Sequence, residues 1–114
     1  MAITQTLTDV FLQDCLDGAH NLGDGGDTLK IALYTSSAAL GKTTSAYITT
    51  QEVSGTGYTA GGATLASQAV SLDATNNVAF FDAADPSFTS ATITARGALI
   101  YNKSKSNAAI AVLD

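Results

Sequence analysis

The single histidine and the single cysteine of the chain are the first residues to weigh for chemistry. His20 and Cys15 together cannot build a common zinc site, which needs several such ligands. One histidine among many serines always permits an imagined Ser–His–Asp arrangement, so that possibility has no weight. Cys15 lies among apolar residues with helical spacing, so we expect a buried, inert thiol. His20 falls at the predicted helix end, where a cation complements the dipole. We therefore expect no enzyme and no catalytic residues.

Three further strings could suggest a ligand site. Residues 36–43 (SSAALGKT) follow a predicted strand, as a phosphate-binding loop would, but the first glycine is replaced by Ser36 and no helix start follows. Residues 55–62 (GTGYTAGG) have the wrong spacing for a dinucleotide fingerprint. Asn21, Asp24 and Asp27 could offer oxygen ligands to calcium, but their spacing does not fit an EF-hand loop. The sequence therefore predicts no cofactor and no metal site.

Charge and hydropathy exclude several classes of partner. The net charge is −5, and the five cationic residues are spread thinly along the chain. Without a basic stripe, we expect no nucleic acid and no anionic membrane as partner. No apolar run approaches the roughly 18 residues of a membrane span, and no secretory signal opens the chain. About half of the residues are Ala, Thr, Ser or Gly, which suits a surface covered by neighbouring subunits.

The elements that would position these residues begin with a helix. Residues 1–22 form the predicted helical segment, with an apolar stripe from Leu7 to Ala19, a cap at Thr6 or Thr8, and an end at Gly18 or Gly23. Residues 28–34 alternate with the period of a strand.

The second half of the chain reads as β structure. Residues 64–72 and 77–82 predict a hairpin around the turn 74–77, and Phe88 is expected in the core. A strand over 92–101, with Gly97 as a bulge or close contact, precedes a polar turn at 102–107 and a final antiparallel strand at 108–113. We expect a single mainly β (α+β) domain over 1–114. It would have an N-terminal amphipathic helix and, over 28–114, an antiparallel β-sandwich or open barrel of about five to six strands. The final strand would present an exposed edge.

The long segment 35–62 lacks clear periodicity, and such segments in compact domains are often functional. Isolated apolar and aromatic residues within it are the candidate protein interface: Leu40, Tyr47, Ile48, Val53 and Tyr58. The alternative interpretation is that these residues pin the loop to the protein's own core.

Four strings carry a resemblance to a known family: residues 27–38 (DTLKIALYTSSA), 52–62 (EVSGTGYTAGG), 95–102 (ARGALIYN) and 111–114 (AVLD). Together they resemble small virion structural proteins of tailed bacteriophages and prophages. The resemblance implies a non-catalytic protein made in the host cytoplasm and located in the virion. Within that setting we expect a head decoration or cement protein that binds the outer capsid surface and stabilises capsomer contacts. Its partners would be the major capsid protein and other copies of itself, as a trimer. The alternatives are a neck or tail component, and a host-recognition module that exposes Tyr47 and Tyr58.

Overall fold

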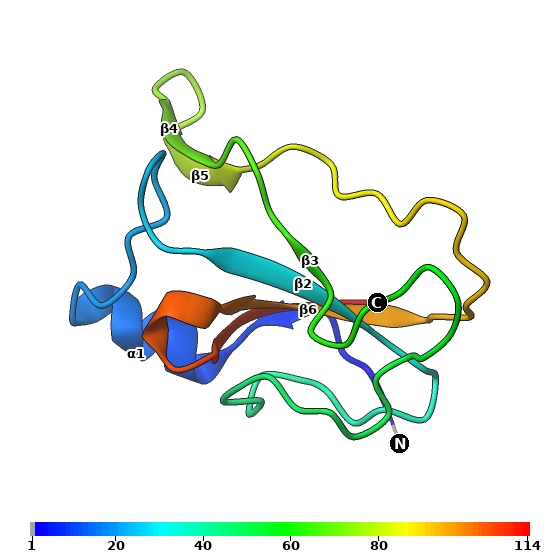
Figure 1. The fold of residues 1–114 in the computed structure, drawn as a ribbon. Helices are drawn as coiled ribbons and strands as arrows, with labels where there is room; N and C mark the ends of the chain where they lie inside the picture. Colours follow the sequence, from blue (N-terminus) through cyan, green and yellow to red (C-terminus); the bar gives the residue numbers. More distant parts are fainter. Residues whose placement is uncertain (1) are drawn as a thin grey trace.

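The protein is mainly β, with one short helix packed against an antiparallel sheet (Figure 1). The computed structural model describes residues 2–114. Within that range the elements are β1 (Thr6–Leu7), α1 (Asp9–Leu16), β2 (Leu29–Tyr34), β3 (Ala63–Thr64), β4 (Ala69–Asp73), β5 (Val78–Asp82), β6 (Gly97–Asn102), the 3₁₀ turn η1 (Lys103–Lys105) and β7 (Ala108–Leu113). Five strands form one sheet in the order β1-β7-β6-β2-β3, and β4 and β5 form a separate hairpin.

The three longest strands of the main sheet, β2, β6 and β7, follow the sequence pattern closely. All six pairs from Leu29↔Asn102 to Tyr34↔Gly97 join β2 to β6, and β7 completes an antiparallel trio. The register between β6 and β7 shifts between Ile100 and Tyr101. Gly97 is the predicted close contact rather than the bulge, because a Cβ there would lie 2.8 Å from the Leu113 carbonyl oxygen and from Ile3. The predicted strand at 108–113 and its pairing are confirmed.

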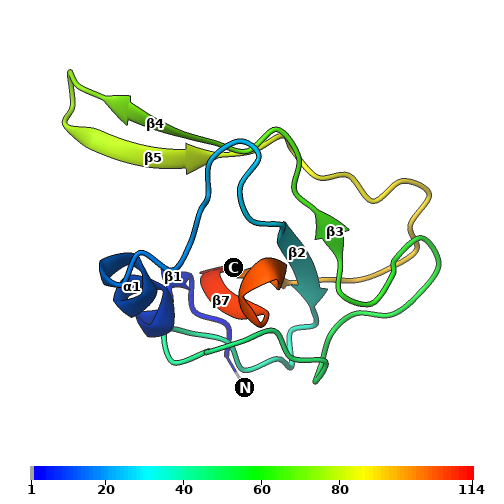
Figure 2. The ribbon, with the colours of Figure 1, turned by 60° about the vertical axis from the view of Figure 1, so that its left-hand side comes forward.

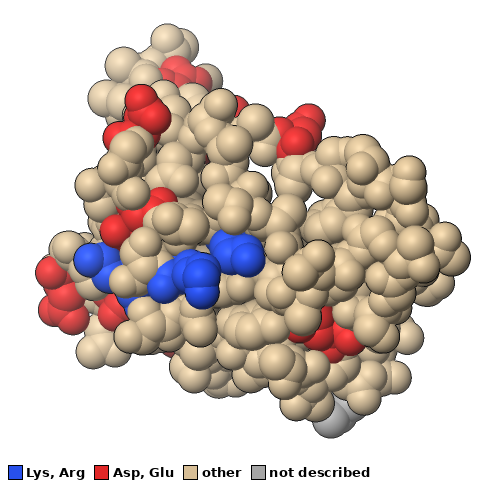
Figure 3. All heavy atoms as spheres, viewed as in Figure 1, with Lys and Arg blue, Asp and Glu red and all other residues tan. Residues whose placement is uncertain are grey.

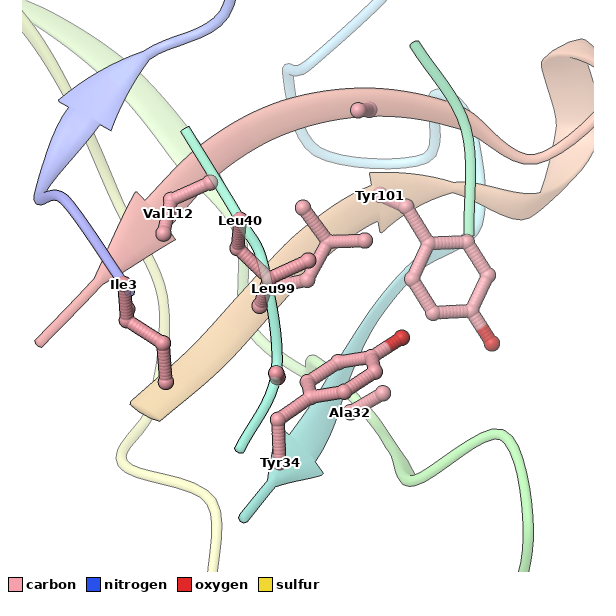
Figure 4. Packing of buried hydrophobic residues seen from close by; sticks show 9 residues of the cluster. Ile3, Ala32, Tyr34, Leu40, Leu99, Tyr101 and Val112 are labelled. Atoms are coloured by element: carbon pink, nitrogen blue, oxygen red, sulfur yellow. The ribbon is translucent and has the colours of Figure 1, made fainter. Parts of the chain in front are cut away.

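Both faces of the main sheet are covered, which explains why its strands are apolar on both sides. One face carries a cluster that includes Tyr34, Leu99, Tyr101 and Val112, covered by the N-terminal segment and by loop residues 38–40 (Figure 4). The opposite face carries Leu29, Ile31 and Ile110 beneath helix residue Phe11. The alternation predicted for residues 28–34 is therefore confirmed, with each face buried against a different layer.

The structure confirms the mainly β, antiparallel class but does not confirm a sandwich or barrel. The hairpin β4–β5 projects from the body as a separate two-stranded unit and does not lie face to face with the main sheet along its length (Figures 1 and 2). The strand expected over 92–101 begins only at Gly97, because residues 92–96 make a single bridge, Thr56↔Thr92, in place of a ladder. Phe88 is half-buried against the Tyr58 ring, with 5.5 Å between centroids, and is not a core residue.

The helix is much shorter than residues 1–22. The Thr8 side chain caps it by accepting from the Phe11 N–H, and it ends before Gly18, whose φ is +67°. The segment before Thr8 is extended instead and forms β1, since its residues pair with the sheet. Only Phe11 of the helix is buried, and Cys15 is exposed, so the expectation of a buried thiol is wrong. The stripe of apolar residues predicted that a helix forms here. It did not predict that the sheet would bury only one residue of that helix.

The edge of β7 is covered, contrary to the expectation of an exposed final strand. Thr6 and Leu7 pair with Val112 and Ala111. The lower half of the same edge is closed by a hydrogen bond of 3.0 Å from the Ala109 N–H to the Ser45 carbonyl. Two segments that are distant in the sequence, β1 and the chain around Ser45, thus cover the edge of β7. No local pattern around residues 108–113 could predict these partners.

A buried polar network holds the segment between α1 and β2. The side chain of His20 is only 2% exposed, and its Nε2 lies 3.2 Å from Asp14 Oδ2. The amide nitrogen of the fully buried Asn102 lies 2.8 Å from His20 Nδ1 and 2.8 Å from Asp27 Oδ2. Since Asp27 can only accept, the amide nitrogen must face it, and His20 Nδ1 then accepts while Nε2–H donates to Asp14. His20 is therefore a structural residue of the core.

Candidate interaction surface

The structure places four of the five proposed interface residues in or against the protein's own core. Leu40 is 3% exposed and Val53 is 5% exposed. Tyr47 and Tyr58 are partly buried, and only Ile48 presents a substantially exposed side chain. Leu40 and Tyr47 pack in or against the cluster on one face of the sheet, so they act as anchors of the loop. This arrangement fits the alternative interpretation, in which the segment 35–62 is pinned to its parent domain.

Glu52 is the centre of that anchorage, and sequence reasoning missed it. Its two carboxylate oxygens accept hydrogen bonds from Tyr47 Oη and Tyr58 Oη, both at 2.6 Å. The Gly61 N–H donates to the same carboxylate at 2.7 Å. Tyr101 Oη donates to the Gly61 carbonyl at 2.7 Å, and the Tyr101 ring stacks on Tyr47 with 4.8 Å between centroids. The sequence offered one indication of this cluster, a single glutamate placed between the tyrosines at positions 47 and 58.

The tyrosines around Glu52 are held in their neutral form. Burial, and then the hydrogen bond and charge of Glu52, raise the pKa of Tyr47 to about 12. The pKa of Tyr58 rises further for the same two reasons, and burial is the main cause of the raised pKa values of Tyr34 and Tyr101. A phenolate beside Glu52 would place two negative charges in a poorly solvated site. The cluster is built to stay protonated and to hold the loop, so it is structural.

The hairpin β4–β5 differs from the loop 35–62 in burial, because nearly all of the hairpin residues are exposed. Cross-strand pairing places Val70 and Leu72 of β4 on the same face as Ala79 and Phe81 of β5. We call this the inner face, because Phe81 packs toward the main sheet. Val70 is 57% exposed and Leu72 is 71% exposed. A two-stranded hairpin is at best marginally stable alone, so this unit gains little from its own folding.

An apolar groove opens beneath the inner face. Its volume is about 490 Å³, and it lies between the hairpin, α1 and one face of the main sheet. Lining residues include Val70 and Phe81 from the hairpin, Phe11 and Cys15 from the helix, and Ile110 from β7. Gln68 fixes the base of the hairpin by contacts of 3.0–3.1 Å from its amide nitrogen to the carbonyls of Leu22, Gly23 and Asp27. The arm is therefore held at its base while its apolar inner face stays uncovered.

Charges are segregated across the surface. The chain between Lys42 and Arg96 contains Glu52, Asp73, Asp82 and Asp85 but no lysine or arginine. The cations on the face shown in Figure 3 gather over β2 and the turn that follows β6, and carboxylates lie over the hairpin, over the loop beside it and also next to the cations on the body. The hairpin is thus an acidic element on a body with a local lysine-rich region.

Of the residues weighed for a metal ion, Asn21 and Asp27 have other contacts in the part of the chain that is described. Among residues 2–114, no group of three or more His, Cys, Asp or Glu side chains could hold a metal ion. Asp27 is occupied by the Asn21 N–H and the Asn102 amide, and these hydrogen bonds lower its pKa although burial opposes them. Partial desolvation and the charge of the neighbouring Asp14 raise the pKa of the Cys15 thiol, and a raised pKa disfavours the reactive thiolate. No helix within residues 2–114 is long and apolar enough to cross a membrane.

Sequence reasoning found the hairpin but not its significance. Alternation predicts strands here, but it does not show that the apolar side chains at positions 70, 72, 78 and 80 are exposed. The short length of the two strands was the one indication of this exposure, because a two-stranded hairpin is too small to bury its own apolar side chains. Comparisons with known proteins add no assignment, because no family model, curated protein or solved structure matches this chain.

Proposed function

We propose that this chain is a structural, non-catalytic protein of a tailed-phage virion, a head decoration or cement protein that binds the outer capsid surface. The observation that carries the proposal furthest is the hairpin arm with its uncovered apolar inner face over an apolar groove. Exposed apolar patches rimmed by polar residues are typical of protein interaction surfaces. The resemblance of four sequence strings to phage virion proteins supplies the setting.

The arm and groove suit a clamp on a protein surface. Leu72 and Val70 would be covered by a segment of the major capsid protein, while the pinned loop and the two-sided core keep the body rigid. Rigid anchors lose little conformational entropy on binding, so more of the contact energy appears as affinity. Tyr47 and Tyr58 are engaged with Glu52, which disfavours the host-recognition alternative because that function needs their rings free for stacking.

The test is binding to purified capsids that lack the protein. Leu72→Ser should weaken binding at least tenfold, the scale of about 1.4 kcal/mol or more expected of a central apolar anchor. Leu16→Ser is the matched control, because Leu16 is 91% exposed on the helix and borders neither hairpin nor groove. Equal binding of both variants and the unaltered chain would contradict the proposed contact.

Copy number separates the head from the neck or tail. A cement protein should be present in numbers comparable to the major capsid protein by quantitative mass spectrometry of purified particles. A dozen copies or fewer would replace the decoration function by the neck or tail alternative.

A further inference from the structure

The outer face of the hairpin arm combines apolar and acidic side chains. Cross-strand pairing leaves Val78 and Phe80 of β5 on the side away from Phe81, together with Asp73 and Asp82. Val78 is 48% exposed and Phe80 is 45% exposed. No backbone hydrogen bond joins β4 or β5 to the rest of residues 2–114. This face therefore has two exposed apolar side chains, of which Phe80 also borders the apolar groove. The two carboxylates beside them accept hydrogen bonds from neighbouring residues of the turn and of the end of the hairpin.

A lysine patch on the body has the complementary charge. Lys30 is the second residue of β2, and Lys103 and Lys105 lie in η1 directly beside that strand. The Lys30 ammonium lies near Gly61, whose carbonyl accepts a hydrogen bond from the Tyr101 hydroxyl. Lys103 and Lys105 are both exposed, and the charge of Lys105 is partly balanced by Asp27 at 3.9 Å.

The acidic arm and the lysine patch do not meet within one chain. The ion pairs in residues 2–114 join Arg96 to Asp114 and Lys105 to Asp27, so none links a hairpin carboxylate to a lysine. The hairpin also projects away from the body in both ribbon views (Figures 1 and 2). Complementary regions that cannot meet internally can meet between copies.

We propose that copies of this chain associate head to tail, with the outer face of one hairpin arm docked on the lysine patch of a second copy. The contact is heterologous, because two different surfaces meet, and such contacts close into rings when the rotation between copies permits. This inference rests on the proposed function, since it supplies the contact between copies of an assembly protein. It uses the outer face of the arm, so the inner face remains for the capsid.

Salt dependence is the first test. Ionic attraction between exposed groups is screened over about 8 Å at 0.15 M salt and about 3 Å at 1 M. Sedimentation velocity of the purified chain should therefore show association that weakens as salt rises. A chain that stays monomeric at up to millimolar concentration, or that associates more strongly at high salt, overturns the proposal. A monomer that still binds capsids would overturn only this inference and leave the proposed function standing.

A charge-swap pair identifies the surfaces. Asp82→Lys on the arm and Lys103→Glu on the patch should each weaken self-association, by about tenfold on the scale of a reversed surface pair. Mixing the two variants should restore association, because each then meets a surface of opposite charge. Asp24→Lys and Lys42→Glu are matched controls, since both positions are exposed and lie outside the two surfaces. Failure of the mixture to associate overturns the assignment.

The two faces of the arm provide an internal control. Val78→Ser should weaken self-association and leave capsid binding unchanged, whereas Leu72→Ser should do the reverse. Both residues are exposed on the same hairpin, so a shared folding defect would alter both readouts equally. Circular dichroism of each variant checks that the body is intact. Loss of self-association by Leu72→Ser but not by Val78→Ser would overturn the assignment of the outer face.

Discussion

The irregular loop 35–62 and the regular hairpin β4–β5 use similar residues in opposite ways. The loop contains no strand of its own, but Leu40 and Val53 are buried, and Glu52 cross-links the loop internally by accepting three hydrogen bonds from other loop residues. The hairpin has a complete five-pair ladder, but leaves Val70 and Leu72 mostly exposed. Regular hydrogen bonding and burial are thus separate properties. In this protein the segment without secondary structure belongs to the core, and the segment with it is the free surface.

The sharpest way to break this comparison is a matched pair of leucine truncations. Leu40→Ala should lower the free energy of unfolding by about 2–5 kcal/mol, because it removes buried side-chain contacts and leaves a cavity. Leu72→Ala should change it by less than about 0.5 kcal/mol, because the side chain is already largely in water. Urea denaturation followed by circular dichroism measures both. Equal losses would show that the hairpin is as well packed as the loop.

Glu52 offers a test of the loop alone. Glu52→Ala leaves Tyr47 Oη, Tyr58 Oη and the Gly61 N–H without their acceptor, so the free energy of unfolding should fall by about 2–3 kcal/mol. Glu52→Gln keeps one acceptor oxygen and should lose less. The measurement is again urea denaturation, now with limited proteolysis to locate cleavage. If residues 45–62 stay protected in Glu52→Ala, the apolar anchors alone hold the loop.

The smallest expected effect is on stability in alkali, and its sign follows from the tyrosine pKa values. Tyr47 has a pKa of about 12 when folded against an ordinary value of 10.0. A raised pKa means that the folded state keeps a proton that the unfolded state loses. This contribution is complete below about pH 10 and disappears as the pH rises through about 12. Absorbance titration near 295 nm should show no normal phenol in the folded protein, whose four tyrosines all have raised pKa values. Four phenols titrating near pH 10 without unfolding would contradict this cluster.

Local patterns in the sequence were sufficient to predict several strands, and to predict their pairing where the partner strand is close in the chain. The strand at 29–34, the hairpin around 74–77 and the final pair β6–β7 all follow from alternation and turn residues. Local patterns failed where contact with a distant segment decides which secondary structure forms. Leu7 fits the apolar stripe of a helix, but the open edge of β7, about a hundred residues later, draws Thr6 and Leu7 into a strand.

The candidate surface was harder to predict for the same reason. Apolar anchors in the loop and apolar residues in the hairpin look equivalent in the sequence. Which set is buried depends on whether another segment has room to cover it. Leu40 packs in the cluster on one face of the sheet and Val53 is buried, whereas Leu72 is mostly exposed.

The buried network around Asn102 gives the protein a built-in spectroscopic reporter. Because the chain has one histidine, a nitrogen NMR spectrum of the imidazole contains signals from His20 alone. When the segment between α1 and β2 is in its folded position, Nδ1 of His20 carries no proton and faces the Asn102 amide, while Nε2 carries the proton and faces Asp14. The tautomer therefore reports, without any added label, whether the segment that supports the base of the hairpin is in place. Docking of a partner on the arm could be followed through that one ring.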